Sequence, residues 1–329
     1  MNILGIETSC DETGAAVVRD GRSVLSNAIA SSVRDHEAYG GVIPEIASRK
    51  QLEFINSVVK KALAEAGTGL DDIDAFAVTR HPGLLGSLLV GLSFTKALSF
   101  ALNKPLIEVD HIQAHLYANF LKEPSSREPA PQLPAIGLIV SGGHTSLFKI
   151  ERLSRFEHLG QTRDDAAGEA FDKVARIMDL GYPGGPIIDK LAKEAGDIKN
   201  LRFTPARLEG TFDFSFSGTK TAVLYHVQRH KQDLDKARVA GAFQKSVVDI
   251  LVQKSIQACQ TEQIRTLLIG GGVAANSGLR SELQNACRNN GIALHIPPLA
   301  YCMDNAAMIA GFAFHSPDLN PSPARGKRR

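Results

Sequence analysis

The chain has 329 residues, of which 43% are hydrophobic and 22% charged, a size and composition typical of two soluble globular domains. These values exclude a wholly disordered chain, and 37 basic against 35 acidic residues leave no strong basic field for nucleic acid. The four cysteines form no CxxC pair, which disfavours a disulfide framework or a cysteine zinc site. The most apolar window, residues 84–102, contains Lys96, and no signal-peptide pattern is visible, so we expect a cytoplasmic protein without a membrane span.

The first part of the chain alternates predicted strands and helices. Strands are expected at residues 3–6, 15–18, from 24 onward, 75–78 and 106–109, and helices at 45–66, from the turn at 82–83 to about 102, and at 111–121. The segment 122–132, rich in proline and polar residues, is predicted to be a linker.

Beyond the linker the opening pattern recurs in outline. A strand at 134–140, a glycine-rich turn at 141–145 and a returning strand at 146–150 are followed later by a strand at 266–269, a turn at 270–272 and a helix from 277. This weak repeat predicts two similar domains, residues 1–130 and 131–329. The second would end in a basic tail from about residue 316, which we expect to be disordered.

Three glycine-rich turns follow strands, at residues 7–14, 141–145 and 270–272. Glycine lets backbone N–H groups face a concavity that binds phosphate oxygens, and strand ends are where open α/β folds bind ligands. Each turn alone could be an ordinary tight turn. Together, at corresponding strand ends of two similar halves, they predict a nucleotide held between the domains.

Two histidines, His111 and His115, lie one helical turn apart on a predicted helix. Residues at this spacing share a helix face, so both imidazoles can reach one metal ion, although two surface histidines are an equally weighted alternative. Ile112 stands where zinc proteases carry their glutamate base, so that chemistry is unsupported. A metal would need a further ligand, for which Asp304 and Asp11 are the carboxylates to test.

A further group of carboxylates lies near tight turns: Glu169 and Asp172 are three residues apart on a predicted helix, and Asp189 follows residues 181–185. Carboxylates in such places can accept ribose hydroxyls. The alternative is a helix amino terminus that favours negative charge through its dipole; both interpretations can hold, since Asp164 and Asp165 suit the dipole while Asp172 lies deeper in the helix.

At these residues the chain closely resembles the TsaD/Gcp family, the tRNA adenosine threonylcarbamoyltransferases, formerly described as O-sialoglycoprotein endopeptidases. The segment from Lys96 to Leu116 fits the family signature at every spaced position, and Ser9-Cys10-Asp11-Glu12 is similar to the bacterial branch. Other family-like segments lie at 5–13, 40–45, 140–145, 168–173, 214–220 and 270–276.

The resemblance implies the α/β ASKHA fold of actin, sugar kinases and heat-shock ATPases, with two duplicated α/β domains around an interdomain nucleotide cleft. It also implies a metal held by His111, His115 and Asp304, for which we expect one divalent ion per subunit, Fe²⁺ ahead of Zn²⁺ or Mg²⁺. ATP or an adenylate nucleotide would bind in the cleft, at positions matching Ile139, Val140, Ser141, Gly142, Gly143, Asp172, Gly185, Asp189 and Asn276.

The implied activity is transfer of the threonylcarbamoyl group from threonylcarbamoyl-AMP to N6 of adenosine 37, in tRNAs that read codons beginning with adenine. AMP is released. An aromatic amine is a poor nucleophile, so a general base is desirable, with Asp11 as first candidate and Glu12 as second. The implied partners are tRNA, a TsaB-type paralogue in a heterodimer and a TsaE-type ATPase, and they could supply RNA contacts beyond the basic stretches at 202–207, 229–231 and the tail.

Two positions depart from the family pattern. His81 replaces a glycine that many relatives carry before Pro82-Gly83, which argues against a phosphate contact there, and Gln51 stands where relatives often have histidine, so we assign it no metal role. The alternatives are an ASKHA-type ATPase or kinase and a non-catalytic scaffold paralogue. Ser141 stands where kinases usually carry a carboxylate, which argues against an ATPase or kinase. The chain keeps the set of His111, His115 and Asp304 that scaffold paralogues lack, which argues against a scaffold. A metalloprotease is disfavoured.

Overall fold

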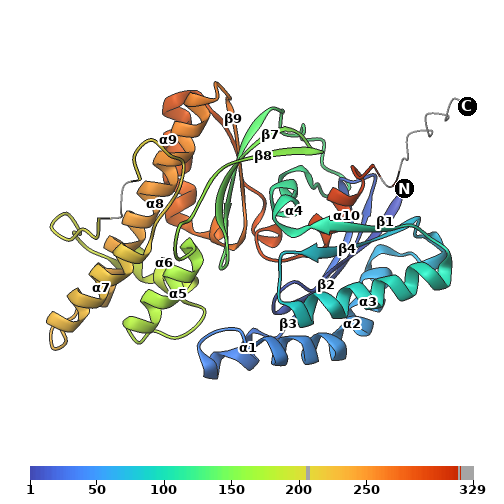
Figure 1. Ribbon diagram of the computed structural model, residues 1–329, viewed down its shortest axis with the longest axis horizontal. Coiled ribbons are helices and arrows are strands. Elements are labelled where there is room, and N and C mark those ends of the chain that lie inside the picture. The colour runs from blue at the N-terminus through green and yellow to red at the C-terminus, as the bar shows by residue number, and fades with distance from the viewer. Residues whose placement is uncertain (205–207, 318, 320–329) are drawn as a thin grey trace, which may run out of the picture. The chain divides into compact units, whose positions relative to one another are not determined.

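The computed structural model describes residues 1–204, 208–317 and 319 (Figure 1). They form two compact units, which are described separately. The first unit contains Met1–Asp35, Val42–Pro129 and the chain from Asp304 onward, and the second contains His36–Gly41 and Ala130–Met303. Most of the expected basic tail, residue 318 and residues 320–329, lies outside the described residues.

The first unit is built on a five-stranded sheet of order β3-β2-β1-β4-β5. Strand β1 pairs antiparallel with β2 and parallel with β4. The strands are β1 (Asn2–Glu7), β2 (Glu12–Arg19), β3 (Ser23–Ser31), β4 (Ala75–His81) and β5 (Leu106–Asp110). The helices are α1 (Val33–His36), which ends in the second unit, α2 (Pro44–Ala66), α3 (Leu85–Leu102), α4 (His111–Tyr117) and α10 (Ala306–Ala313). The predicted helix at 111–121 ends at Tyr117 and continues as a 3-10 turn.

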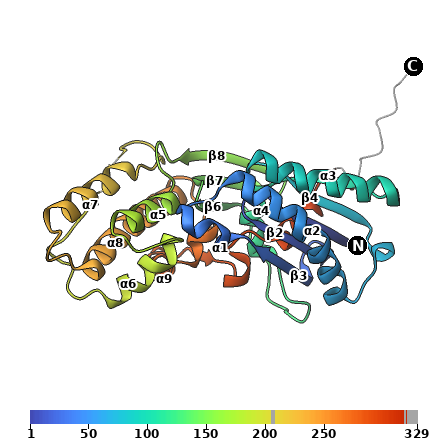
Figure 2. The ribbon, with the colours of Figure 1, turned by 90° about the horizontal axis from the view of Figure 1, so that it is seen from below.

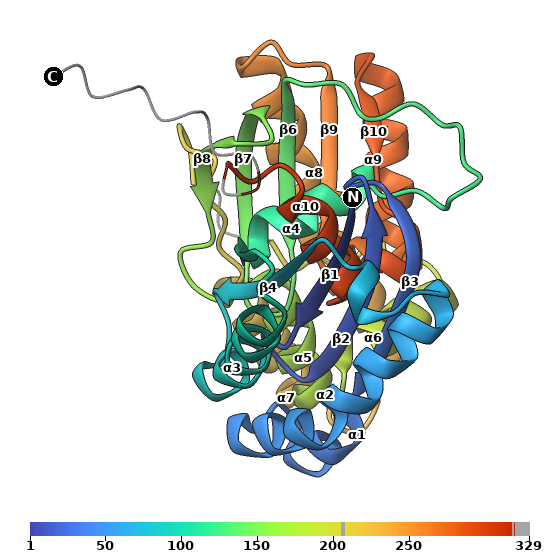
Figure 3. The same cartoon turned by 90° about the vertical axis from the view of Figure 1, so that its right-hand side faces the viewer.

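Both faces of β1 are buried from Ile3 onward, which is why residues 3–6 of the strand are apolar. Leu4 and Ile6 point to one face and pack in a core shared with α2. Gly5 points to the opposite face, where a Cβ atom would come within 2.5–2.9 Å of atoms of Ala306 and Ala310. Figure 3 shows α2 and α3 on one side of this sheet and α4 and α10 on the other.

This packing explains a difference from the expected division of the chain. We placed everything after residue 130 in the second domain, but the segment from Asp304 onward belongs to the first unit. Helix α10 is almost wholly apolar and buried, and it packs on β1 and β2, where Gly5 leaves room for its backbone. The chain also passes between the units at Asp35–His36, Gly41–Val42 and Pro129–Ala130, so residues 36–41 belong to the second unit although we had placed them in the first domain.

The second unit has a sheet of order β10-β9-β6-β7-β8. Its strands are β6 (Ala135–Val140), β7 (Thr145–Arg152), β8 (Arg155–Gln161), β9 (Thr266–Gly270) and β10 (Ala293–His295). Helices α5, α6, α7 and α8 pack against one another, and α9 packs on α8 and β10 (Figure 2). Their bounds are α5 (Ala167–Ile177), α6 (Gly184–Glu194), α7 (Ser217–Arg229), α8 (Lys236–Thr261) and α9 (Ser277–Asn290).

The two sheets have the same topology. Strands β1 to β5 correspond in order and direction to β6 to β10, since β1 and β6 each begin an antiparallel hairpin and each pair on the other side with a parallel strand. The hairpins close at Glu7↔Gly14 and Val140↔Thr145. The internal repeat predicted from the sequence is therefore confirmed at the level of the fold.

Among the described residues, α3 is the one helix long and apolar enough to span a membrane by length and composition. It packs on β4 and α2, with Ser87, Gly91 and Thr95 buried on its inner face. Its outer face exposes Leu85, Leu89 and Phe100 by 75%, 53% and 90%.

Candidate functional site

Helix α4 presents two imidazoles on one face immediately after β5. Asp110 starts the helix, because its Oδ1 accepts a hydrogen bond of 2.9 Å from the backbone N–H of Gln113. His111 and His115 are then one turn apart, and both are buried. Their Nε2 atoms lie 3.2 Å apart, so the two rings converge on one point.

Asp304, two residues before α10, completes the cluster. Its Oδ1 lies 3.1 Å from His115 Nε2 and 3.5 Å from His111 Nε2. Ligands bound about 2.1 Å from one metal ion at tetrahedral or octahedral angles are roughly 3.0–3.4 Å apart, so the three atoms are spaced as a metal site requires. Two imidazoles and one carboxylate suit Zn²⁺ or Fe²⁺. The structure thus brings together His111, His115 and Asp304, and Asp11 is not part of this set.

The charges in this cluster depend on one another. Burial alone would lower the pKa of His111, but the carboxylates of Asp304 and Glu7 outweigh it and raise the pKa to about 9. Burial, with the neighbouring His111, lowers the pKa of His115. Burial would raise the pKa of Asp304, but the two histidines hold it well below its usual range. Without a metal, a proton on His111 therefore balances the Asp304 carboxylate, and a bound cation would displace that proton.

The turn between β1 and β2 lies against the cluster. Ser9 Oγ is 3.2 Å from His111 Nδ1 and also hydrogen-bonds Asp304. Asp11 is buried, and Glu12 begins β2. Burial, followed by the charges of Asp304 and Asp11, raises the pKa of Glu12 well above its ordinary value. Both candidate bases therefore lie between the end of β1 and the start of β2, beside the cluster, and the upward pKa shift of Glu12 makes its carboxylate the stronger base.

Gln51, to which sequence reasoning gave no role, fixes the backbone of this turn. The residue is wholly buried on α2. Its Nε2 donates to the carbonyl oxygens of Thr8, Cys10 and Glu12 at 3.3, 2.9 and 3.1 Å. From α3, Ser87 Oγ also donates to the carbonyl of Cys10. The sequence shows only a polar residue in the middle of an amphipathic helix. Nothing in that local pattern predicts hydrogen bonds to three carbonyls of a turn about 40 residues away.

The glycine-rich turn of the second unit follows β6, whose last residues Ile139 and Val140 are wholly buried. The backbone N–H of Ser141 donates to the carbonyl of His144, which closes the turn. Gly142 and Gly143 are exposed, and a Cβ on either would meet nothing within 4 Å. Their backbone is therefore open to a ligand such as a phosphate.

The other predicted nucleotide-binding residues contact or form the starts of helices in the same unit. Asp172 accepts from the backbone N–H groups of Gly184 and Gly185 at the start of α6, while burial raises its pKa. Asp189 accepts from the N–H and hydroxyl of Ser277. Asn276 caps α9. Asp172 therefore holds the start of α6 through its carboxylate.

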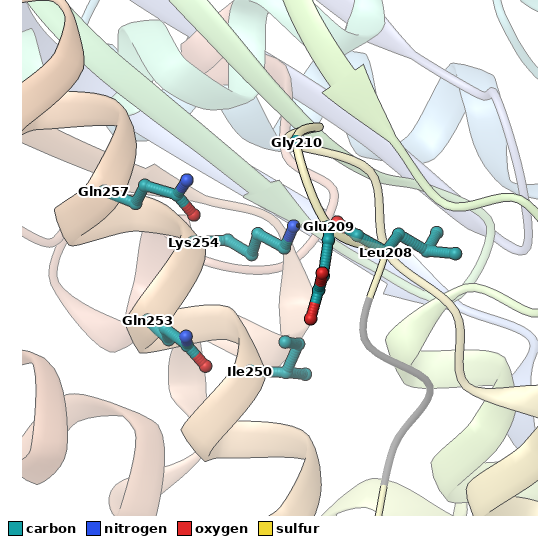
Figure 4. Close-up of a pocket in the computed structure, with 7 residues that line it drawn as sticks. All are labelled: Leu208, Glu209, Gly210, Ile250, Gln253, Lys254 and Gln257. Atoms are coloured by element: carbon teal, nitrogen blue, oxygen red, sulfur yellow. Dashed lines mark hydrogen bonds between the residues drawn. The ribbon is translucent and has the colours of Figure 1, made fainter.

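A pocket of about 210 Å³ lies elsewhere in the second unit, between α8 and the loop at 208–210 (Figure 4). None of the predicted site residues lines it. The buried Lys254 donates to the carbonyls of Leu208 and Thr211, so this side chain holds the loop in place.

His81, which stands where many relatives have glycine, contacts a nearby carboxylate. Its Nδ1 lies 3.2 Å from Oδ2 of Asp110, the residue that starts α4. Gly83, two residues later, packs so closely on Ser9 that a Cβ would approach the Ser9 carbonyl oxygen to 2.6 Å. The turn at 81–83 therefore supports the backbone that surrounds the histidine pair.

Two duplicated α/β units, one of them carrying a His-His-carboxylate cluster, define an ASKHA-fold protein with a candidate metal centre. The fold is shared with HypF of T. kodakarensis, at a TM-score of 0.64 and 12% identity over 97% of this chain and 48% of that one. It is shared also with component A of the Acidaminococcus fermentans (R)-2-hydroxyglutaryl-CoA dehydratase, at a TM-score of 0.56 and 14% identity over 95% and 98% of the two chains.

The particular family follows from sequence comparison. The model of the family described as TsaD, tRNA N6-adenosine threonylcarbamoyltransferase, matches residues 23–311. The tRNA N6-adenosine threonylcarbamoyltransferase of Symbiobacterium thermophilum is 52% identical over 334 residues, which is 98% of this chain and 96% of the relative. The chain therefore belongs to this family and is a transferase.

Metal affinity is expected to rise with pH. The pKa of His111 is about 9 without metal, so below that pH a metal must displace the imidazole proton. The apparent affinity for Zn²⁺ should increase roughly tenfold per pH unit between about pH 6 and pH 8. Competition with a chelator of known affinity at each pH measures this. An affinity that does not change with pH would contradict the presence of a displaceable proton on His111.

Replacing Gln51 by leucine should destabilise the first unit. The change keeps the approximate volume but leaves the carbonyls of Thr8, Cys10 and Glu12 without their shared donor, at a cost of about 1–3 kcal/mol. Urea unfolding measures the loss. Gln257→Leu, at an exposed position of α8, is the matched control and should change stability little. Equal stability of the two variants would refute the role of Gln51.

Proposed function

We propose that this chain transfers the threonylcarbamoyl group of threonylcarbamoyl-AMP to N6 of adenosine 37, in tRNAs that read codons beginning with adenine, and releases AMP. Family membership over nearly the whole chain supports the reaction class. The observation that carries the proposal is the cluster of His111, His115 and Asp304 beside the turn that holds Asp11 and Glu12.

In the proposed step the N6 amine attacks the carbamoyl carbon. The new N–C bond forms as the bond from that carbon to the phosphate oxygen breaks, and AMP leaves with the electron pair. The amine loses a proton, which a carboxylate of the β1–β2 turn would accept. Asp11 and Glu12 are the candidates, and the raised pKa of Glu12 supports it in this role. The open backbone at Gly142 and Gly143 supports binding of the phosphate in the second unit.

The proposed cofactor is one divalent metal ion per subunit, held by His111, His115 and Asp304. Two imidazoles with one carboxylate match non-haem Fe²⁺ sites and catalytic Zn²⁺ sites and suit Mg²⁺ less well, and the family resemblance leads us to place Fe²⁺ ahead of Zn²⁺. When bound, the ion would supply a Lewis acid for a carbonyl or phosphate oxygen. An adenylate nucleotide or ATP would bind the second unit at the turn after β6, near Asp172, Gly185, Asp189 and Asn276.

The proposed partners are tRNA, a TsaB-type paralogue and a TsaE-type ATPase, all in the cytoplasm. The near-neutral charge of the chain supports shared RNA binding, and of the basic stretches only residues 202–204 and 229–231 lie among the described residues. A protein partner is supported by α3, whose outer face exposes Leu85, Leu89 and Phe100. We assign this face to the TsaB-type paralogue.

Asp304→Ala should abolish transfer in a reaction that contains the chain, its partners, tRNA and threonylcarbamoyl-AMP. Losing one metal ligand removes several kcal/mol of charge stabilisation, so the rate should fall at least about a hundredfold. Mass spectrometry of digested tRNA measures modified adenosine. Asp249→Ala, at an exposed carboxylate of α8, is the control. Full activity of Asp304→Ala would refute the metal role, and phosphoryl transfer without modified adenosine would favour the kinase alternative.

Leu89→Glu should weaken binding of the TsaB-type paralogue. Leu89 is half-exposed on the outer face of α3, so the change places a charge in the proposed interface without disturbing the core. Calorimetric titration with the paralogue should show at least about a tenfold higher Kd. Lys61→Glu, at an exposed position of α2, tests whether charge alone has this effect. An unchanged Kd for Leu89→Glu would contradict the assignment of this face.

A further inference from the structure

Glu7, the last residue of β1, is a carboxylate sealed inside the first unit with no exposed surface. Its Oε1 accepts a hydrogen bond of 2.5 Å from the backbone N–H of Ser9. Its Oε2 accepts one of 2.6 Å from the hydroxyl of Thr79 and lies 3.0 Å from Nδ1 of His111. Neither the metal cluster nor the proposed transfer step, as set out above, includes this residue.

The contacts of Glu7 determine which ring nitrogen of His111 keeps its proton when a metal binds. The backbone N–H of Ser9 can only donate, and the Thr79 hydroxyl donates to Oε2, so the Glu7 carboxylate acts as an acceptor towards all its neighbours. Nδ1 of His111 must then donate to Oε2. That leaves Nε2, on the side of His115 and Asp304, to supply the lone pair that a metal needs.

The two histidines are not equivalent in this respect. Nδ1 of His115 is buried and has no hydrogen-bond partner among the residues that the structure describes. His111 is therefore the one imidazole of the pair that a carboxylate orients from behind. Metal-bound histidines usually donate their second N–H to such a carboxylate, which fixes the ring and makes the ligand more basic.

We propose that Glu7 is a positioning residue for the metal centre: it holds His111 with Nδ1 protonated and Nε2 directed at the ion, and its negative charge strengthens that ligand. The inference rests on the proposed metal site. The alternative is a purely structural role, in which Glu7 would only anchor Thr79 and the β1–β2 turn. A structural anchor would not change metal affinity in a protein that stays folded, so the two roles can be distinguished.

The test is Zn²⁺ binding to the purified full-length protein, measured by competition with a chelator. Glu7→Gln keeps the size of the side chain, but an amide has one acceptor oxygen and cannot serve both Ser9 and the Thr79–His111 side. We expect Zn²⁺ affinity to fall by about tenfold to a hundredfold. In the Zn²⁺-bound wild type, proton NMR should show a protected Nδ1–H resonance of His111, assigned by its loss in His111→Asn, and Glu7→Gln should shift or broaden it.

Two further variants keep the outcome decisive. Thr79→Val leaves Glu7 and His111 in place but removes the hydroxyl that holds Oε2, so it should lower Zn²⁺ affinity by a smaller factor, about twofold to tenfold. Glu108→Gln, a half-buried carboxylate of β5 that pairs with Arg80 and Lys96, should bind Zn²⁺ as the wild type does.

A folded Glu7→Gln protein with wild-type Zn²⁺ affinity and an unchanged His111 resonance would overturn the proposal. If that variant does not fold, Thr79→Val decides, and unchanged affinity and resonance there would overturn it equally. Failure of the wild type itself to bind Zn²⁺ would refute the metal site beneath the proposal, which distinguishes the two failures.

Discussion

The close packing of α10 on β1 is the contact on which the candidate metal centre depends. Gly5 has no side chain on the face that α10 covers, so the helix backbone lies directly against the strand. Asp304 stands at the entry to this helix and is brought to within 3.1 Å of His115, although the two are 189 residues apart in sequence. The first unit is therefore complete only when α10 packs on β1.

The duplicated fold uses the same hairpin for two different purposes. In the first unit the β1–β2 turn carries Ser9, Asp11 and Glu12, and α2 and α3 hold its backbone carbonyls through Gln51 and Ser87. In the second unit the corresponding turn carries Gly142 and Gly143, where a Cβ atom would meet nothing within 4 Å. One copy thus places carboxylates beside the group of His111, His115 and Asp304, and the other has an exposed glycine turn at the same place in the fold.

Local patterns predicted most of the fold and part of the site. Alternation and periodicity located β1, β4, β6, β9, α2 and α3 to within a few residues, and the i, i+4 spacing placed His111 and His115 on one face. The domain assigned to the segment from Asp304 onward differs from the division seen in the structure, because the apolar sequence of α10 does not say which sheet the helix covers. Glu7 and Gln51 were missed for a related reason: their roles come from contacts across 104 residues to His111 and across about 40 to the turn, and no local pattern reports these.

The most direct test of the account is X-ray absorption spectroscopy of the metal bound to the purified protein. The convergence of His111 Nε2, His115 Nε2 and Asp304 Oδ1 predicts a first coordination shell of nitrogen and oxygen, with the multiple scattering of two imidazole rings and no sulfur. A shell that contains a thiolate, or one without imidazole scattering, would contradict it.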